Sequence, residues 1–146
     1  MSWARHLCWT LSFWSTIGVD IDVEVDVDVN VGVDANYLVT ARNLGAVLSI
    51  SRATAALQWL LAPTLPALSN FTFENDAAMF FEPHDVSQLP NGDVLLVDDG
   101  NDRPGCAALA AKDYRGCFSR AIQYELDLLA GAARVRWQFE YPVRLN

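Results

Sequence analysis

Several residue types are scarce in this chain of 146 residues, and each scarcity excludes a class of partner or binding site. There are 10 Lys and Arg against 18 Asp and Glu, which gives a formal net charge of -8. Nucleic-acid binders carry a basic footprint and anionic membrane surfaces attract cations, so neither partner is expected. Only two histidines and three cysteines occur, with no Cys-x-x-Cys motif and no Cys/His cluster. The chain thus lacks a zinc pattern, and we expect no metal and no cofactor.

Long apolar runs are missing as well. No uninterrupted stretch approaches the roughly 20 apolar residues that a transmembrane helix requires. The segment Leu7–Val19 is apolar after a basic start, as in a signal peptide, but Ser and Thr interrupt it and no clear cleavage site follows. A secreted and a cytoplasmic location therefore both stay open. In the secreted case, Cys106 and Cys117 could form a disulfide within one loop-like segment.

Apolar and aromatic side chains are abundant, at 52% and 11% of the chain. This content and this length suffice for one domain with a packed core. The apolar residues come in short runs separated by Gly, Pro, Asn and Asp, which is typical of an all-β chain. The expected strands are Tyr37–Ala41, Ala46–Ile50, Leu57–Leu61, His84–Leu89, Asp93–Val97, Ala121–Leu126 and Arg134–Tyr141.

The expected strands fall into two similar units. Asp34–Val39 parallels Asn91–Leu96, and each unit ends in an outer strand that carries a tryptophan, Trp59 or Trp137. A repeated four-stranded antiparallel unit of this size is typical of a β-propeller blade, so we expect an incomplete ring with both tryptophans in the blade cores. A β-sandwich is the alternative. The expected parts are an N-terminal segment of unassigned structure (1–18), a Val/Asp run (19–33) and two blades (34–62 and 84–142) joined by a loop.

In the Val/Asp run, acidic side chains alternate with valine and isoleucine. If the run is extended, its polar residues from Asp20 to Asn30 all fall on one face. One interpretation is a calcium-binding ladder, but the run fails the EF-hand pattern because Gly32 is misplaced and no closing Glu follows. The other interpretation, which we favour, is one over-long strand from Val19 to Val33 whose acidic face is solvated.

The most informative segment runs from His84 to Arg103. The histidine opens one strand, the turn Leu89–Asp93 reverses the chain, and the next strand ends in an acidic, glycine-bearing loop that presents the arginine. The hairpin thus brings an imidazole and a guanidinium toward the same end of a sheet. Such a pair suits the binding or transfer of an anionic group.

The other charged residues near this hairpin have structural explanations. We expect the carboxylates of Asp98, Asp99 and Asp102 to cap the loop and to face solvent. We expect Arg120 to make a structural contact between strands.

Five segments follow one another in the order found in a known family. They are Asn36–Arg42, His84–Asp85, Leu89–Arg103, Ser119–Asp127 and Trp137–Pro142. Together they resemble the arylsulfotransferases, which use an aryl sulfate rather than a nucleotide as sulfuryl donor. The resemblance implies a six-bladed propeller, of which this chain would hold two blades.

The resemblance also implies roles for individual residues. In the family, a histidine nucleophile takes the sulfuryl group from a phenyl sulfate and passes it to a phenol through a sulfohistidine. His84 matches an active-site histidine that would assist the leaving or attacking phenolic oxygen. Arg103 matches an arginine that would hold sulfuryl oxygens. The implied substrates are thus an aryl sulfate and a phenol.

The chain departs from the family pattern at two histidines. A His-x-Asn element is expected before the Asn36 strand, where this sequence has Thr16 and Gly18. The nucleophilic histidine is expected beyond Pro142, where nothing matches it. We therefore expect a propeller fragment that is inactive alone. The alternative function is a non-catalytic β-repeat module that binds a partner through exposed blade edges.

Overall fold

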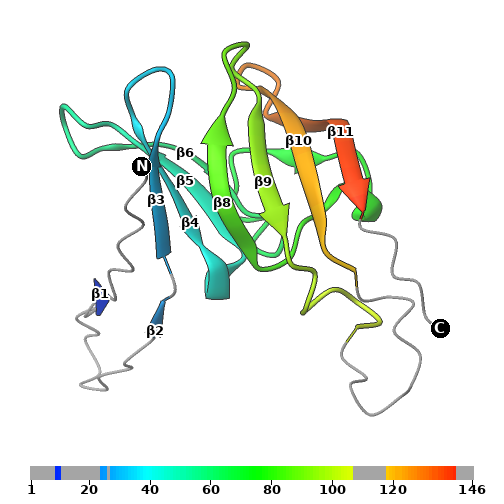
Figure 1. Cartoon of the computed structure of the whole chain (residues 1–146). Coiled ribbons are helices and arrows are strands. Elements are labelled where there is room, and N and C mark those ends of the chain that lie inside the picture. The colour runs from blue at the N-terminus through cyan, green and yellow to red at the C-terminus, as the bar shows by residue number, and fades with distance from the viewer. Residues whose placement is uncertain (1–8, 11–23, 26, 107–117, 141–146) are drawn as a thin grey trace.

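The computed structural model describes residues 9–10, 24–25, 27–106 and 118–140. This described part is all-β, as expected, and contains two large sheets and a two-stranded ribbon (Figure 1). The ribbon joins β1 (Trp9–Thr10) to β2 (Glu24–Val25). Helical structure within these ranges is limited to two 3-10 turns, η1 (Arg42–Leu44) and η2 (Asp76–Ala78). No helix in the described ranges is long and apolar enough to cross a lipid bilayer.

The first sheet is a four-stranded antiparallel meander. Its strands, in spatial order, are β3 (Val27–Val31), β4 (Tyr37–Ala41), β5 (Ala46–Ile50) and β6 (Leu57–Leu61). The last three have the bounds that the sequence predicts, because β-branched and large apolar residues lie between strong turn signals. One such signal is Gly45, which ends η1 in the left-handed region with φ 59°.

The second sheet has five strands. Their spatial order is β7 (Thr72–Phe73), β11 (Ala132–Glu140), β10 (Arg120–Asp127), β9 (Val94–Asp98) and β8 (Pro83–Gln88). Strands β8 to β11 form a second antiparallel meander, and β7 pairs with β11 in parallel. The turn between β8 and β9 is closed by a hydrogen bond from Leu89 N to Asp93 O (2.8 Å), as the Pro-Asn-Gly signal predicts.

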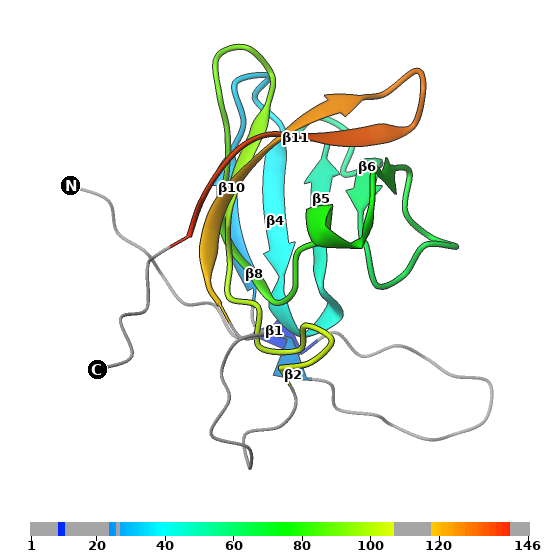
Figure 2. The same ribbon diagram turned by 90° about the vertical axis from the view of Figure 1, so that its right-hand side faces the viewer.

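The two meanders pack face to face, with β8 beside β3 and β4 (Figures 1 and 2). Asn30 ties them together by donating a hydrogen bond from Nδ2 to Val86 O (2.9 Å). The sheets do not close a ring, so the architecture is consistent with an incomplete propeller or a sandwich. The shared core consists of Leu38, Val47, Trp59, Leu61, Phe71, Phe80, Val86, Val94, Leu96, Ile122, Tyr124 and Ala133.

The Val/Asp run differs from the single strand we expected. Within its described residues, β2 pairs with β1 and β3 pairs with β4, so the two segments belong to different sheets. Strand β3 ends at Val31 because a turn follows, in which Gly32 N donates to Asn36 O (2.8 Å). Residues 19–23 lie outside the described ranges.

The environment of β3 differs in part from the expected one. Val27 packs against an apolar cluster, but Val29 and Val31 are exposed. On the polar face, the half-buried Asp28 and the exposed Asn30 both make hydrogen bonds to the second sheet, so this face contributes to the contact between the sheets. At this position the second sheet presents the His84 ring and the backbone carbonyl of Val86. These polar groups form hydrogen bonds with a carboxylate and an amide, which a valine side chain could not form.

The two tryptophans have different environments. Trp59 is 7% exposed and lies in the core, as expected, but Trp137 is 49% exposed, so its assignment to a blade core is wrong. A β-bulge causes the difference: Tyr124 pairs with Val135, and the preceding Gln123 pairs with Trp137. The extra residue turns Val135 toward the core and Trp137 to the opposite face of the sheet.

Candidate functional site

His84 lies near the start of β8, at the edge of the second sheet that meets the first. Its backbone is distorted on both sides: Glu82 and Asp85 have φ of 52° and 48°, a region that residues other than glycine rarely adopt. The pairing with β9 also shifts between His84 and Ser87. Such local strain persists only where the surrounding structure enforces it, and it is frequent at functional sites.

Side chains from both sheets contact the His84 ring, whose side chain is 26% exposed. On one side, Nδ1 lies 3.3 Å from Asp28 Oδ2. On the other, Nε2 lies 2.9 Å from Arg42 Nε and 3.1 Å from Asp99 Oδ2. Asp28 belongs to β3, Arg42 follows β4 and Asp99 follows β9. The imidazole is thus the point where three strand ends meet.

The contacts at Nε2 define two hydrogen-bonding states of His84. Arg42 Nε is a donor, so Nε2 can accept from it only when the ring is neutral with its proton on Nδ1, facing Asp28. A protonated ring instead donates from Nδ1 to Asp28 and from Nε2 to Asp99. Asp28 is a suitable acceptor in both states, and Nε2 is the nitrogen whose partner changes. This is the arrangement of a histidine that exchanges a proton at Nε2 while a carboxylate orients Nδ1.

Arg42 is held beside His84 by carboxylates. Its Nη2 forms an ion pair with Glu82 Oε2 and lies 3.7 Å from Asp99 Oδ2. Asn101 donates a second hydrogen bond to Glu82 Oε2 (2.7 Å). Three carboxylates therefore surround one guanidinium and one imidazole. An incoming anion would have to displace Glu82 or Asp99 from Arg42, which disfavours tight anion binding by this cluster alone.

Sequence reasoning did not single out Arg42 as a site residue, although the internal repeat carries a signal for it. The matching segments align β4 with β9, so the residue that follows each strand takes an equivalent place in its unit. Those residues are Arg42 and Asp99, and both reach His84. A search for charged residues directly after equivalent strands of the repeat would have identified Arg42 and Asp99.

Arg103 lies at the same end of the second sheet as His84, but its guanidinium has other partners. It is 8% exposed and donates from Nη2 to Asp98 Oδ2 (2.5 Å) and from Nη1 to Met79 O (3.4 Å). Its plane also lies over the Phe118 ring, 4.1 Å from the centroid. Among the described residues, no hydrogen bond or ion pair joins Arg103 to His84.

Asp98 is the centre of a buried charge cluster and does not face solvent as we expected. It is fully buried, and its Oδ2 also accepts from Arg120 Nε (2.8 Å) while its Oδ1 accepts from Phe81 N (2.9 Å). The bond from Arg120 on β10 to Asp98 on β9 confirms the contact between strands expected of Arg120. Arg120 Nη2 also donates a hydrogen bond to Met79 O (2.6 Å). Burial without a partner would be costly for these three charges, so each satisfies the others. Asp102 is exposed, in line with expectation.

The loop that carries Arg103 needs a glycine at position 100. Gly100 has φ 71°, and a Cβ there would lie 2.3 Å from Phe118 O. The glycine thus lets the loop pass close to the chain that begins β10. Cys106, at the end of the described loop, is disulfide-bonded, while its predicted partner Cys117 lies outside the described ranges.

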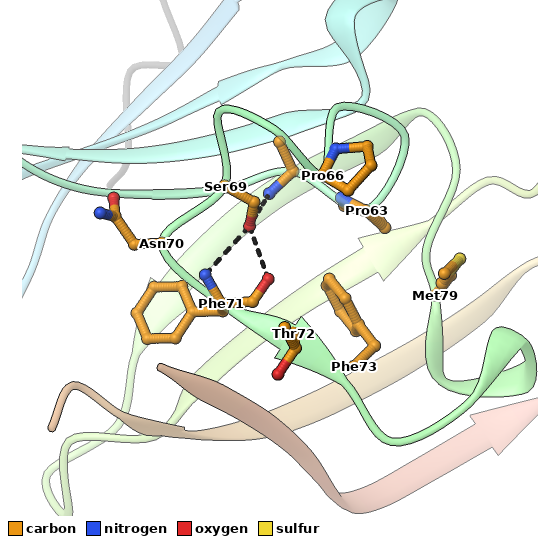
Figure 3. A pocket seen from close by; sticks show the side chains of 9 residues that line it. Pro63, Pro66, Ser69, Asn70, Phe71, Thr72, Phe73 and Met79 are labelled. Carbon is orange, nitrogen blue, oxygen red and sulfur yellow. Dashed lines mark hydrogen bonds between the residues drawn. The ribbon is translucent and has the colours of Figure 1, made fainter. Parts of the chain in front are cut away.

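A separate hollow of about 270 Å³ lies between the loop after β6 and strand β7 (Figure 3). Its lining is largely apolar, with Pro63, Phe73 and Met79 around it. Ser69 is part of the lining, but its Oγ is already bonded to the backbone N and O of Phe71. None of the residues around His84 lines this hollow, so it is not part of the same site.

Within the described ranges, no group of three or more His, Cys, Asp or Glu side chains is arranged to hold a metal ion. The His84 cluster is a hydrogen-bonded group of one imidazole, one guanidinium and the carboxylates of Asp28, Glu82 and Asp99. In comparisons with known proteins, the chain matches no protein-family model and no curated protein.

Proposed function

We propose that this chain is a segment of an arylsulfotransferase-like propeller, and that His84 and Arg42 form part of its sulfuryl-transfer site. The observation that carries the proposal is the His84 ring, held at Nδ1 by Asp28 and presented at Nε2 to Arg42 and Asp99. The two four-stranded meanders support the propeller segment, since each has the strand order of a blade.

In this proposal, His84 handles the proton and not the sulfuryl group. A protonated Nε2 can donate to the oxygen of a departing phenolate, and a neutral Nε2 can accept the proton of an attacking phenol. Asp28 keeps the ring oriented in both steps. The resemblance assigns the covalent sulfohistidine step to a different histidine, and this chain has no second histidine in that sequence context.

Arg42 takes the sulfuryl oxygens in the proposal. Its guanidinium is part-exposed and adjoins Nε2 of His84, so a sulfate ester that displaces the more distant Asp99 carboxylate (3.7 Å) can contact both residues. The role that the resemblance gives to Arg103 stays a prediction. To fulfil it, Arg103 would have to exchange its bond to the buried Asp98, and that exchange would leave Asp98 with fewer donors.

The proposal is tested with 4-nitrophenyl sulfate as donor and phenol as acceptor. We expect the chain alone to release no nitrophenolate above the rate without protein, because the nucleophilic histidine is missing. Mass spectrometry after incubation should show no added sulfuryl group. Turnover accompanied by a sulfuryl group on His84, both lost in His84→Gln, would overturn the assignment of His84 to proton transfer.

A further inference from the structure

The segment that leads into β7 carries an acceptor sequence for N-linked glycans. Asn70-Phe71-Thr72 is the only Asn-x-Ser/Thr triplet in the chain, and its middle residue is not proline. A triplet of this kind carries a glycan only at the surface of a protein that enters the secretory pathway. The environment of Asn70 and the redox state of the cysteines therefore bear on whether the triplet is used.

The fold places the two defining residues of the triplet at the surface. The central Phe71 is 4% exposed and packs edge-on against the Trp59 ring, with the two centroids 6.0 Å apart. Asn70 and Thr72 flank this anchor, and both are exposed. Figure 3 shows the side-chain amide of Asn70 directed away from the apolar hollow that the residue borders. A glycan on Asn70 would therefore extend into solvent.

The side-chain amide of Asn70 has one bonded atom and one free atom. Asn70 N donates to Leu60 O (2.8 Å), and Leu60 N donates to Asn70 Oδ1 (2.7 Å), so the two residues form a pair of hydrogen bonds at the edge of β6. Within the described ranges, Asn70 Nδ2 makes no hydrogen bond. N-glycosylation replaces one hydrogen on Nδ2 and leaves Oδ1 as an acceptor, so both bonds to Leu60 can persist.

The redox state of Cys106 indicates the compartment. This cysteine is disulfide-bonded. Disulfides form and persist in oxidising compartments such as the lumen of the endoplasmic reticulum, and they are rare in the cytosol. N-linked glycans are added in the same lumen. The disulfide and the triplet are separate observations, and both favour entry into the secretory pathway.

Exposed leucines lie close to the triplet. Leu68 precedes Asn70 by two residues, and a Cβ on Gly131 would lie 3.0 Å from Asn70 O. Gly131 ends the turn that carries Leu128 and Leu129. Leu68, Leu128 and Leu129 are 65%, 65% and 102% exposed, the largest values among the large apolar residues of the described part. A bulky polar glycan at Asn70 would shield this apolar surface from other proteins.

We propose that Asn70 is an N-glycosylation site, modified as the chain enters the endoplasmic reticulum, and that the glycan leaves both bonds to Leu60 in place. Asn70 Nδ2 forms a bond to C1 of the first sugar of an oligosaccharide carried on a lipid pyrophosphate. The C1–O bond to the pyrophosphate breaks, the lipid pyrophosphate leaves with the bonding electrons, and Nδ2 releases one proton. The proposal does not depend on sulfuryl transfer.

Peptide mapping by mass spectrometry tests the proposal on the chain isolated from the cells that produce it naturally. We expect the peptide that contains Asn70 to carry an oligosaccharide. Peptide-N-glycosidase in heavy-oxygen water should release the glycan and convert Asn70 to a labelled aspartate. A natural chain in which this peptide occurs only without a sugar overturns the proposal.

Variants of the full chain, expressed behind a cleavable leader peptide in cultured eukaryotic cells, test the sequence requirement. Thr72→Ser keeps the hydroxyl group and should be glycosylated like the wild type. Thr72→Ala is the matched control, which keeps Asn70 but should lose the glycosidase-sensitive shift in gel mobility. A secreted wild-type chain without a glycan, or a shift that persists in Thr72→Ala, overturns the proposal.

Amide hydrogen exchange at Leu60 tests the fit of the glycan to the fold. The exchange rate should be the same in the glycosylated wild type and in the unglycosylated Thr72→Ala, because Asn70 Oδ1 accepts from Leu60 N in both. Asn70→Ala removes the acceptor and should speed the exchange. A glycosylated chain that exchanges at Leu60 as fast as Asn70→Ala contradicts the proposed geometry. Circular dichroism of each variant separates a local change from lost folding.

Discussion

Arg42 Nε donates a hydrogen bond of 2.9 Å to His84 Nε2, and the two residues come from different sheets, 42 positions apart in the chain. The bond fixes the proton of the neutral His84 ring on Nδ1, next to Asp28 on a third strand. The cluster can therefore form only when the two meanders are packed together. Its geometry reports directly on that packing.

The first prediction concerns the tautomer of His84. In the wild-type chain, the neutral ring should carry its proton on Nδ1, since Asp28 accepts there and Arg42 donates to Nε2. Asp28→Ala removes the acceptor, so the Nε2–H tautomer should increase. Nitrogen-15 NMR of the imidazole measures the two populations, and His84→Gln assigns the signal against His6, the other histidine of the chain. Unchanged imidazole shifts in Asp28→Ala would contradict the role of Asp28.

The second prediction concerns Asp98. Asp98→Ala leaves two guanidiniums facing each other without their buried carboxylate, and we expect a loss of about 3–5 kcal/mol in unfolding free energy. Asp102→Ala is the control, because Asp102 is exposed in the same loop and its loss should cost less than about 0.5 kcal/mol. Urea denaturation gives both values. Similar, small losses in the two variants would mean that Asp98 is solvated after all.

The third prediction separates the two tryptophans. Trp59→Ala should cost about 3–5 kcal/mol because it opens a cavity in the shared core. Trp137→Ala should cost less than about 1 kcal/mol because half of this side chain is exposed. The comparison uses denaturation curves of the two variants, followed by circular dichroism. A large loss at Trp137 would place it in a core.

The fourth prediction compares two glycines in the left-handed region. Gly100→Ala should destabilise the fold by about 2 kcal/mol or more, since the new Cβ meets Phe118 O in addition to the unfavourable φ. Gly92→Ala, at φ 90° with open space around it, should cost only the backbone term of about 1 kcal/mol. Thermal denaturation ranks the two. Equal losses of stability in the two variants would show that the loop at Gly100 can move away from Phe118 O without a cost in free energy.

Most of the strands were predictable because local signals set them. β4, β5 and β6 have the expected bounds, since each apolar run lies between turn signals in the sequence. The side that each strand presents was less predictable. Strict alternation cannot reveal a bulge, so it put Trp137 in the core with Val135. It also could not show that Asp28 would find a histidine on another sheet.

The candidate site was predictable only in part. His84 was located through a resemblance in sequence, and its position in a strand end followed from the hairpin. Its partners come from three separate strand ends, and no spacing along the chain encodes such an encounter. Arg103 was assigned to an anion because the hairpin presents it and the resemblance gives it that role, but its spacing could not show that its guanidinium would be bonded to the buried Asp98.

One measurement tests the central claim most directly: titration of the nitrogen-15-labelled chain with phenyl sulfate, followed at the His84 imidazole. The account predicts a saturable change in the Nε2 signal that disappears in Arg42→Met and persists in Arg52→Met. Arg52 is an exposed arginine of the first sheet that packs over Tyr37, away from His84. A His84 signal that phenyl sulfate leaves unchanged, or a change that does not require Arg42, would contradict the account.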